Sequence, residues 1–178
     1  YKRFYKADKT YNWIVAEYTG RPESSEEYYE QCRLLLEYYN ATAMYENQVK
    51  GLFKYFKQKF CTHLLADQPD IIRDIIKDSK VERGKGIHMV DNIKNYAEIL
   101  TRDWLKEEYA PGKLNLNKIY SIPLLKELIK YHREGNFDRV IAIFMLRLYD
   151  SELFYMHTRQ TEVAQQDNVD DFFKRSLF

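Results

Sequence analysis

The segment from residue 41 to residue 60 constrains the fold of this chain most strongly. Its first residues, Ala-Thr-Ala-Met-Tyr at 41–45, are typical of a short buried strand. Glu46 follows directly, and apolar residues at helical spacing then predict a helix from Gln48 to about Phe60. A strand, an acid and a helix in immediate succession favour an α/β domain, in which helices cover a mixed sheet.

Other segments repeat these two patterns along the chain. β-rich runs at 1–6 and 11–18 predict a hairpin. Ser24 and Glu27 form a capping box, which predicts a helix ending near Tyr39, with Asn40 as its stop. The remaining expected elements are a helix over about 91–108 capped by Asp91, helices over about 121–135 and 139–156, and short strands at 61–65 and 114–120. Because the chain is polar from residue 158 onward, we expect a domain at 1–157 and a loosely ordered tail at 158–178.

Composition bounds the class of protein. A chain of 178 residues with 45% hydrophobic and 31% charged residues is typical of one soluble globular domain. The net charge of +1 excludes a globally basic protein, so nucleic acid would have to bind through local patches. Cys32 and Cys61 belong to no paired motif and are expected to be reduced thiols. The longest apolar run is too short to cross a bilayer, and we expect no membrane partner.

Two acids stand where a sheet and a helix meet. Mg²⁺ and Mn²⁺ prefer carboxylate oxygens, and open α/β sheets present ligands at the carboxyl ends of their strands. Glu46 occupies such a position, although an acid there also suits the dipole of the following helix, and the two explanations are equally good. Asp138 precedes a strongly apolar helix, where spacing alone favours a simple N-cap over a metal ligand.

Basic residues offer local contacts for phosphate. The loop Arg83-Gly84-Lys85-Gly86 favours phosphate binding, because glycines let backbone N–H groups approach an anion. His88 follows this loop, and a structural role for it is the more common one. Lys50 and its helical neighbours also suit a phosphate backbone, although a solvated helix face explains them more simply.

These motifs together resemble one known family. The region from Ala16-Glu17-x-x-Gly20 through Tyr39-Asn40 to Glu46-Asn47 and Gly51 resembles the nuclease domain of a tailed-phage terminase large subunit, the motor that packages DNA. The late segments Leu124–Leu128 and Asn136–Ala142 resemble the same family, and the overall pattern is nearest to terminases of crAss-like phages.

The resemblance implies a fold and a function. It implies a ribonuclease-H-like fold and a hydrolase that cuts concatemeric double-stranded DNA with Mg²⁺ or Mn²⁺. Glu46 and Asp138 would be catalytic metal ligands, and Arg83, Lys85, His88 and Lys50 would contact DNA. The implied protein partners are the portal protein and the small terminase subunit, and the implied location is the host cytoplasm at the procapsid portal.

The chain also departs from the family pattern. The first acid of the family lies on an opening strand, which we expect to be missing because the chain starts within a hairpin. Asp8 is the nearest acid but lies in a turn at the wrong end of its strands, and Arg139 stands where the family often has a second acid. Two alternatives therefore stay open: a resolvase- or transposase-like nuclease of the same fold, and a non-catalytic module that docks the motor through residues 158–178.

Overall fold

The computed structural model describes residues 1, 12–48, 50–72 and 84–175, with side chains described as far as residue 156. The described residues form a mixed α/β structure with five α-helices and one two-stranded sheet. The elements in chain order are α1 (Ser25–Tyr38), α2 (Gly51–Gln58), the 3₁₀ turn η1 (Thr62–Leu64), α4 (Asp91–Lys106), β1 (Glu108–Ala110), β2 (Lys113–Leu114), the 3₁₀ turn η2 (Asn115–Lys118), α5 (Ile122–Lys130) and α6 (Asp138–Arg175).

Helix α1 begins and ends as its sequence predicts. The Glu27 N–H donates to Ser24 Oγ at 3.1 Å, which is the expected N-cap. At the other end Asn40 adopts a left-handed φ of 46°, and the Ala41 N–H reaches back to the Leu36 carbonyl at 2.8 Å. This is a Schellman motif, with asparagine at the position that requires positive φ.

Three extended segments pair beside α2 in place of a continuous sheet. Ala43 bridges Leu65 in parallel, and Glu46 bridges Ile87 in parallel. Asp67 bridges Lys85 in the antiparallel sense, so the segment at 84–87 pairs with both of the others. The sheet β1–β2 is a separate antiparallel hairpin. The mixed pairing agrees with the α/β class, and the described residues contain no larger sheet.

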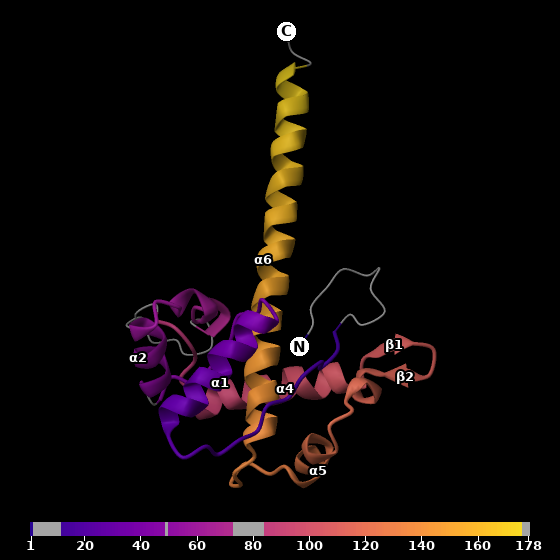
Figure 1. Ribbon diagram of the computed structural model, residues 1–178. Coiled ribbons are helices and arrows are strands. Elements are labelled where there is room, and N and C mark those ends of the chain that lie inside the picture. Colours follow the sequence, from indigo (N-terminus) through magenta and orange to yellow (C-terminus); the bar gives the residue numbers. More distant parts are fainter. Residues whose placement is uncertain (2–11, 49, 73–83, 176–178) are drawn as a thin grey trace.

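Helices α4 and α6 cross to form the main core (Figure 1). Ile93 and Ala97 of α4 and Val140, Phe144 and Leu148 of α6 are almost fully buried there, because each helix places its apolar residues on one face. Ile72 and Ile87 join the same cluster and tie it to the paired segments. A second cluster lies under α1 and α2, and a third lies between α4, α5 and α6.

Two predicted strands consist mostly of 3₁₀ turns, with only Leu65 of the first and Leu114 of the second in a strand pairing. The segment predicted as a strand at 61–65 forms η1, because the Cys61 N–H closes the end of α2 on the Phe56 carbonyl at 2.9 Å. The segment predicted at 114–120 forms β2 and η2, because Asn117 Oδ1 accepts the Leu114 N–H at 2.8 Å. The bond to Asn117 is a local side-chain bond of the kind that competes with strand pairing.

Other boundaries also differ from the sequence prediction. Within 12–18 only Trp13 takes part in a β-bridge, and the partner run at 1–6 lies almost wholly outside the described residues. Asp91 is the first residue of α4, whose cap is Val90. Helix α6 continues to Arg175 through the segment expected to be loosely ordered, and no Gly or Pro occurs there to stop it.

None of the helices in the described part of the chain is both long and apolar enough to cross a membrane.

Candidate functional site

Glu46 lies at the end of a paired segment and outside the neighbouring helix. The Asn47 N–H donates to the Ile87 carbonyl and the Ile87 N–H to the Tyr45 carbonyl, each at 2.8 Å, so the backbone on both sides of Glu46 is held. Helix α2 begins only at Gly51 and has no acid in its first turn. Glu46 therefore lies too far before α2 to be a first-turn acid that stabilises the dipole of this helix. Its half-buried carboxylate has no ion pair within the described residues.

The glycine loop packs tightly against this segment. Gly86 has a φ of +80°, and a Cβ there would lie 2.7 Å from the Tyr45 carbonyl oxygen. Only glycine allows this backbone to come so close, so the loop is fixed beside Glu46.

The four residues expected to contact DNA have different environments. The Lys85 ammonium contacts Asp67 Oδ1 at 3.0 Å and the Leu65 carbonyl at 2.8 Å, so it is already engaged in holding the loop. His88 and Lys50 are exposed. Arg83, and likewise Asp8, lies outside the described residues.

Asp138 is the first residue of α6 and is exposed. A backbone N–H in the first turn of this helix finds its acceptor on α5, because the Arg139 N–H donates to Glu127 Oε2 at 3.1 Å. Asp138 also lies close enough to α1 to affect Tyr28. Burial chiefly, together with the charges of Cys32, Tyr18 and Asp138, raises the pKa of Tyr28 to about 12.

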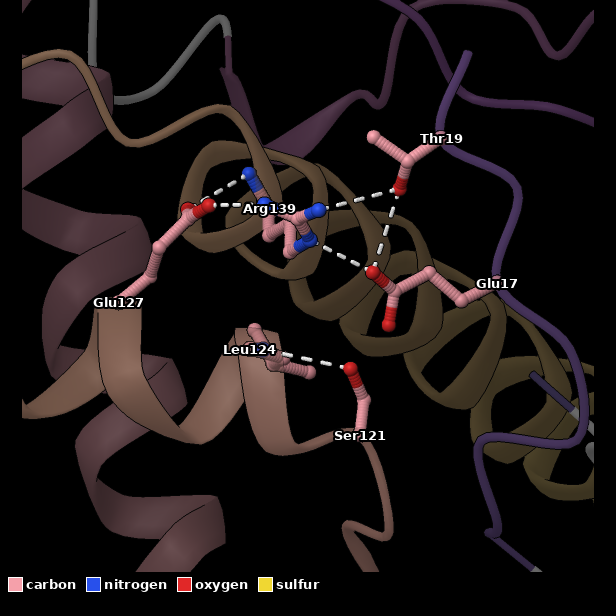
Figure 2. Close-up of polar contacts among 6 residues, drawn as sticks. All are labelled: Glu17, Thr19, Ser121, Leu124, Glu127 and Arg139. Carbon is pink, nitrogen blue, oxygen red and sulfur yellow. Dashed lines mark hydrogen bonds and ion pairs between the residues drawn. The ribbon is translucent and has the colours of Figure 1, made fainter.

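Arg139 joins three separate segments (Figure 2). Its guanidinium binds the Glu127 carboxylate through Nη1, and through Nε it binds Glu17 Oε1 at 2.6 Å. Nη2 also approaches Thr19 Oγ1 at 3.5 Å. Burial pushes the pKa of Glu17 upward, but hydrogen bonds from Ser121 and Arg139 and the charge of Arg139 outweigh it, and the pKa is lowered. The cluster of Glu17, Glu127 and Arg139 is called the arginine clamp below.

Sequence reasoning missed the arginine clamp. Glu17 and Arg139 are separated by 122 positions, and no local pattern reports such a contact. The one available signal was Arg139 itself, a cation where the resemblance places a second acid.

The candidate acids approach one core from different elements. Met44, two residues before Glu46, and Phe137, just before Asp138, both pack on the cluster that contains Ile87 and Val140. Carboxylates are the right donors for Mg²⁺ or Mn²⁺. However, no group of three or more His, Cys, Asp or Glu side chains within the described residues is placed to hold a metal. The two carboxylates are therefore donors of the right kind, and the described residues do not assemble a three-donor metal site around either of them.

No model of a protein family matches this chain, and neither the curated proteins nor the solved structures contain a significant match to it.

Proposed function

We propose that this chain is the nuclease domain of a phage terminase large subunit, with a ribonuclease-H-like fold, that cuts concatemeric double-stranded DNA during packaging. The observation that carries the proposal is Glu46. Its backbone is fixed between two hydrogen bonds to Ile87, and its carboxylate has no ion pair within the described residues. A carboxylate held in this way, outside any helix start, is an oxygen donor of the kind that Mg²⁺ and Mn²⁺ bind.

Asp138 is the proposed second ligand. The arginine clamp fixes the first turn of α6, and with it the backbone that carries Asp138. In this proposal a further acid, which the terminase resemblance implies, completes a site for Mg²⁺ or Mn²⁺. Such a metal, when bound, activates water and stabilises charge at the phosphate.

The residues around Glu46 suit a phosphate backbone. The loop at 84–86 is close to the end of the segment that carries Glu46. Exposed Lys50 follows Glu46 by four residues, and exposed His88 directly follows Ile87, the bridge partner of Glu46. We assign His88 and Lys50 to contacts with the DNA backbone, while Lys85 holds the loop through Asp67.

The direct test is nicking of supercoiled plasmid in Mn²⁺ by the full-length protein. Glu46→Gln and Asp138→Asn each remove one charge with little change of shape, and each is expected to lower the nicking rate by at least about a hundredfold. Glu37→Gln, an exposed acid on α1, is the matched control and should leave the rate unchanged. Unchanged nicking in Glu46→Gln would refute the assignment. A clear preference for four-way junctions over linear duplex would favour the resolvase-like alternative.

A second candidate function rests on α6. This helix continues to Arg175, and its C-terminal half projects well beyond the rest of the molecule (Figure 1). A projecting helix suits a motor-docking module, with the portal protein as partner. Deletion of residues 158–178 should then abolish portal binding in a pull-down while Mn²⁺-dependent nicking is kept. Retained portal binding would exclude this role.

A further inference from the structure

Helix α2 presents lysines on one face. Lys50, Lys54 and Lys57 are spaced four and three residues apart, so they lie on the same side of the helix, and all three are exposed. Within the part of the chain that the structure describes, none of them forms an ion pair with an acid. Lys59, also exposed, follows at the C-terminal end.

This face is cationic although the protein is almost neutral. No Asp or Glu occurs from Asn47 to Ala66, while the net charge of the whole chain is +1. On α1, which contacts α2, the acids Glu30 and Glu37 are both bound by Arg33. Like charges at these spacings destabilise a helix, and within the row only Lys57, in the last turn, suits the dipole of α2, so helix stability does not explain the whole row.

Phe60 stands at the end of the lysine row in an unusual conformation. Its φ is +55°, in the left-handed region that bulky side chains rarely adopt. The Phe60 N–H bonds the Lys57 carbonyl at 3.1 Å and the Cys61 N–H bonds the Phe56 carbonyl at 2.9 Å, so Phe60 takes the Schellman position that glycine prefers. Its side chain is 91% exposed. Within the described residues, neither the backbone conformation nor side-chain packing explains a phenylalanine there.

Helix α1 ends with the same kind of turn and shows which residue such a turn ordinarily carries. Asn40 holds the same position at the end of α1, with a φ of 46°, and asparagine tolerates it. The two helices therefore end in the same way, but only in α2 does the residue with positive φ itself carry an aromatic ring; in α1 the exposed rings of Tyr38 and Tyr39 precede that residue.

We infer that Phe60 and the row of Lys50, Lys54 and Lys57 form a binding surface for single-stranded or frayed DNA. The lysines neutralise phosphates, and the exposed ring stacks on an unpaired base. Stacking on aromatic side chains accepts any base, and lysines follow any backbone, so this surface is sequence-tolerant. The inference deepens the proposed function, on which its choice of DNA as ligand rests. It adds a contact for the open strand or end that a DNA-cutting protein produces.

The test is fluorescence anisotropy with a labelled single-stranded oligonucleotide and a blunt duplex of the same sequence. Phe60→Gly is expected to weaken single-strand binding about tenfold while raising the melting temperature, since glycine suits positive φ. Phe60→Tyr should keep the affinity. The double variant Lys54→Gln/Lys57→Gln should reduce the slope of log affinity against log salt by about 1.4.

Asn40→Gly is the matched control, because it places glycine at the equivalent turn of α1 without removing a ring. This variant should bind single-stranded DNA as the wild type does. Equal single-strand affinity of Phe60→Gly and the wild type would overturn the inference. Polyglutamate can compete for the lysines but cannot stack on Phe60. If polyglutamate displaced the labelled oligonucleotide equally well from Phe60→Gly and from the wild type, the surface would be a general polyanion site, and the inference would again be overturned. Glu46→Gln should lose nicking and keep single-strand binding, so failure of this surface and failure of the nuclease site are distinguishable.

Discussion

Glu127 binds Arg139 twice, with one carboxylate oxygen on the guanidinium and the other on the backbone N–H. The first contact neutralises a half-buried cation, and the second satisfies a donor at the start of α6 that the helix cannot satisfy itself. One side chain of α5 therefore fixes both the first turn of α6 and the arginine that reaches Glu17.

Glu127→Gln is expected to lower the free energy of unfolding by about 1 kcal/mol. The amide keeps the shape and one acceptor but loses the charge that strengthens both bonds, and partial solvent exposure limits the effect. Urea denaturation followed by circular dichroism measures it. Asp103→Asn, in an exposed pair with Arg102, is the control and should change stability by less than about 0.5 kcal/mol. An equal effect of the two substitutions would contradict the arginine clamp.

Acid should release Glu17 from the arginine clamp. The folded-state pKa of Glu17 is lowered, so its contribution to stability is fully present above the unfolded-state pKa and is lost as the pH falls through the folded-state pKa. We expect stability to fall from about pH 5 downward, and Glu17→Gln to lose less over that range. Urea midpoints measured at several pH values in both proteins check this. Identical pH profiles would show that Glu17 takes no part.

Gly86→Ala should disturb the segment that carries Glu46. The new Cβ would meet the Tyr45 carbonyl at 2.7 Å in a backbone with positive φ, and a cost of about 1–3 kcal/mol is expected. Gly112→Ala is a close control, because its φ is +68° with nothing within 4 Å of the added Cβ. It should therefore cost only the backbone strain, about 1 kcal/mol. Denaturant melts of the two variants measure the difference, and a larger loss for Gly112→Ala would refute the close packing of the loop.

The sequence predicted those features that local chemistry decides. The cap of α1 at Ser24 and its stop at Asn40 were both confirmed, because each depends on hydrogen bonds to backbone groups a few residues away. Of the strand predicted at 114–120 only Leu114 lies in a strand, because Asn117 Oδ1 accepts the Leu114 N–H and the chain turns into η2.

Local sequence patterns could not predict contacts between residues far apart in the chain. Glu46 was predicted at a segment end, and it lies there, but its pairing with Ile87 depends on the loop folding back. The arginine clamp depends on Glu17, Glu127 and Arg139 meeting from three elements. The positive φ of Phe60 was invisible in sequence, because phenylalanine is a poor indicator of a left-handed turn.

Paramagnetic broadening by Mn²⁺ tests the central claim most directly, because it reports where the cation binds without requiring turnover. In an amide NMR titration of the protein, we expect the Asn47 and Ile87 signals and those at the start of α6 to broaden first. Glu46→Gln should abolish the broadening at Asn47 and Ile87. Broadening centred instead on the acidic first turn of α1, unchanged in Glu46→Gln, would contradict the assignment of Glu46 as a metal ligand.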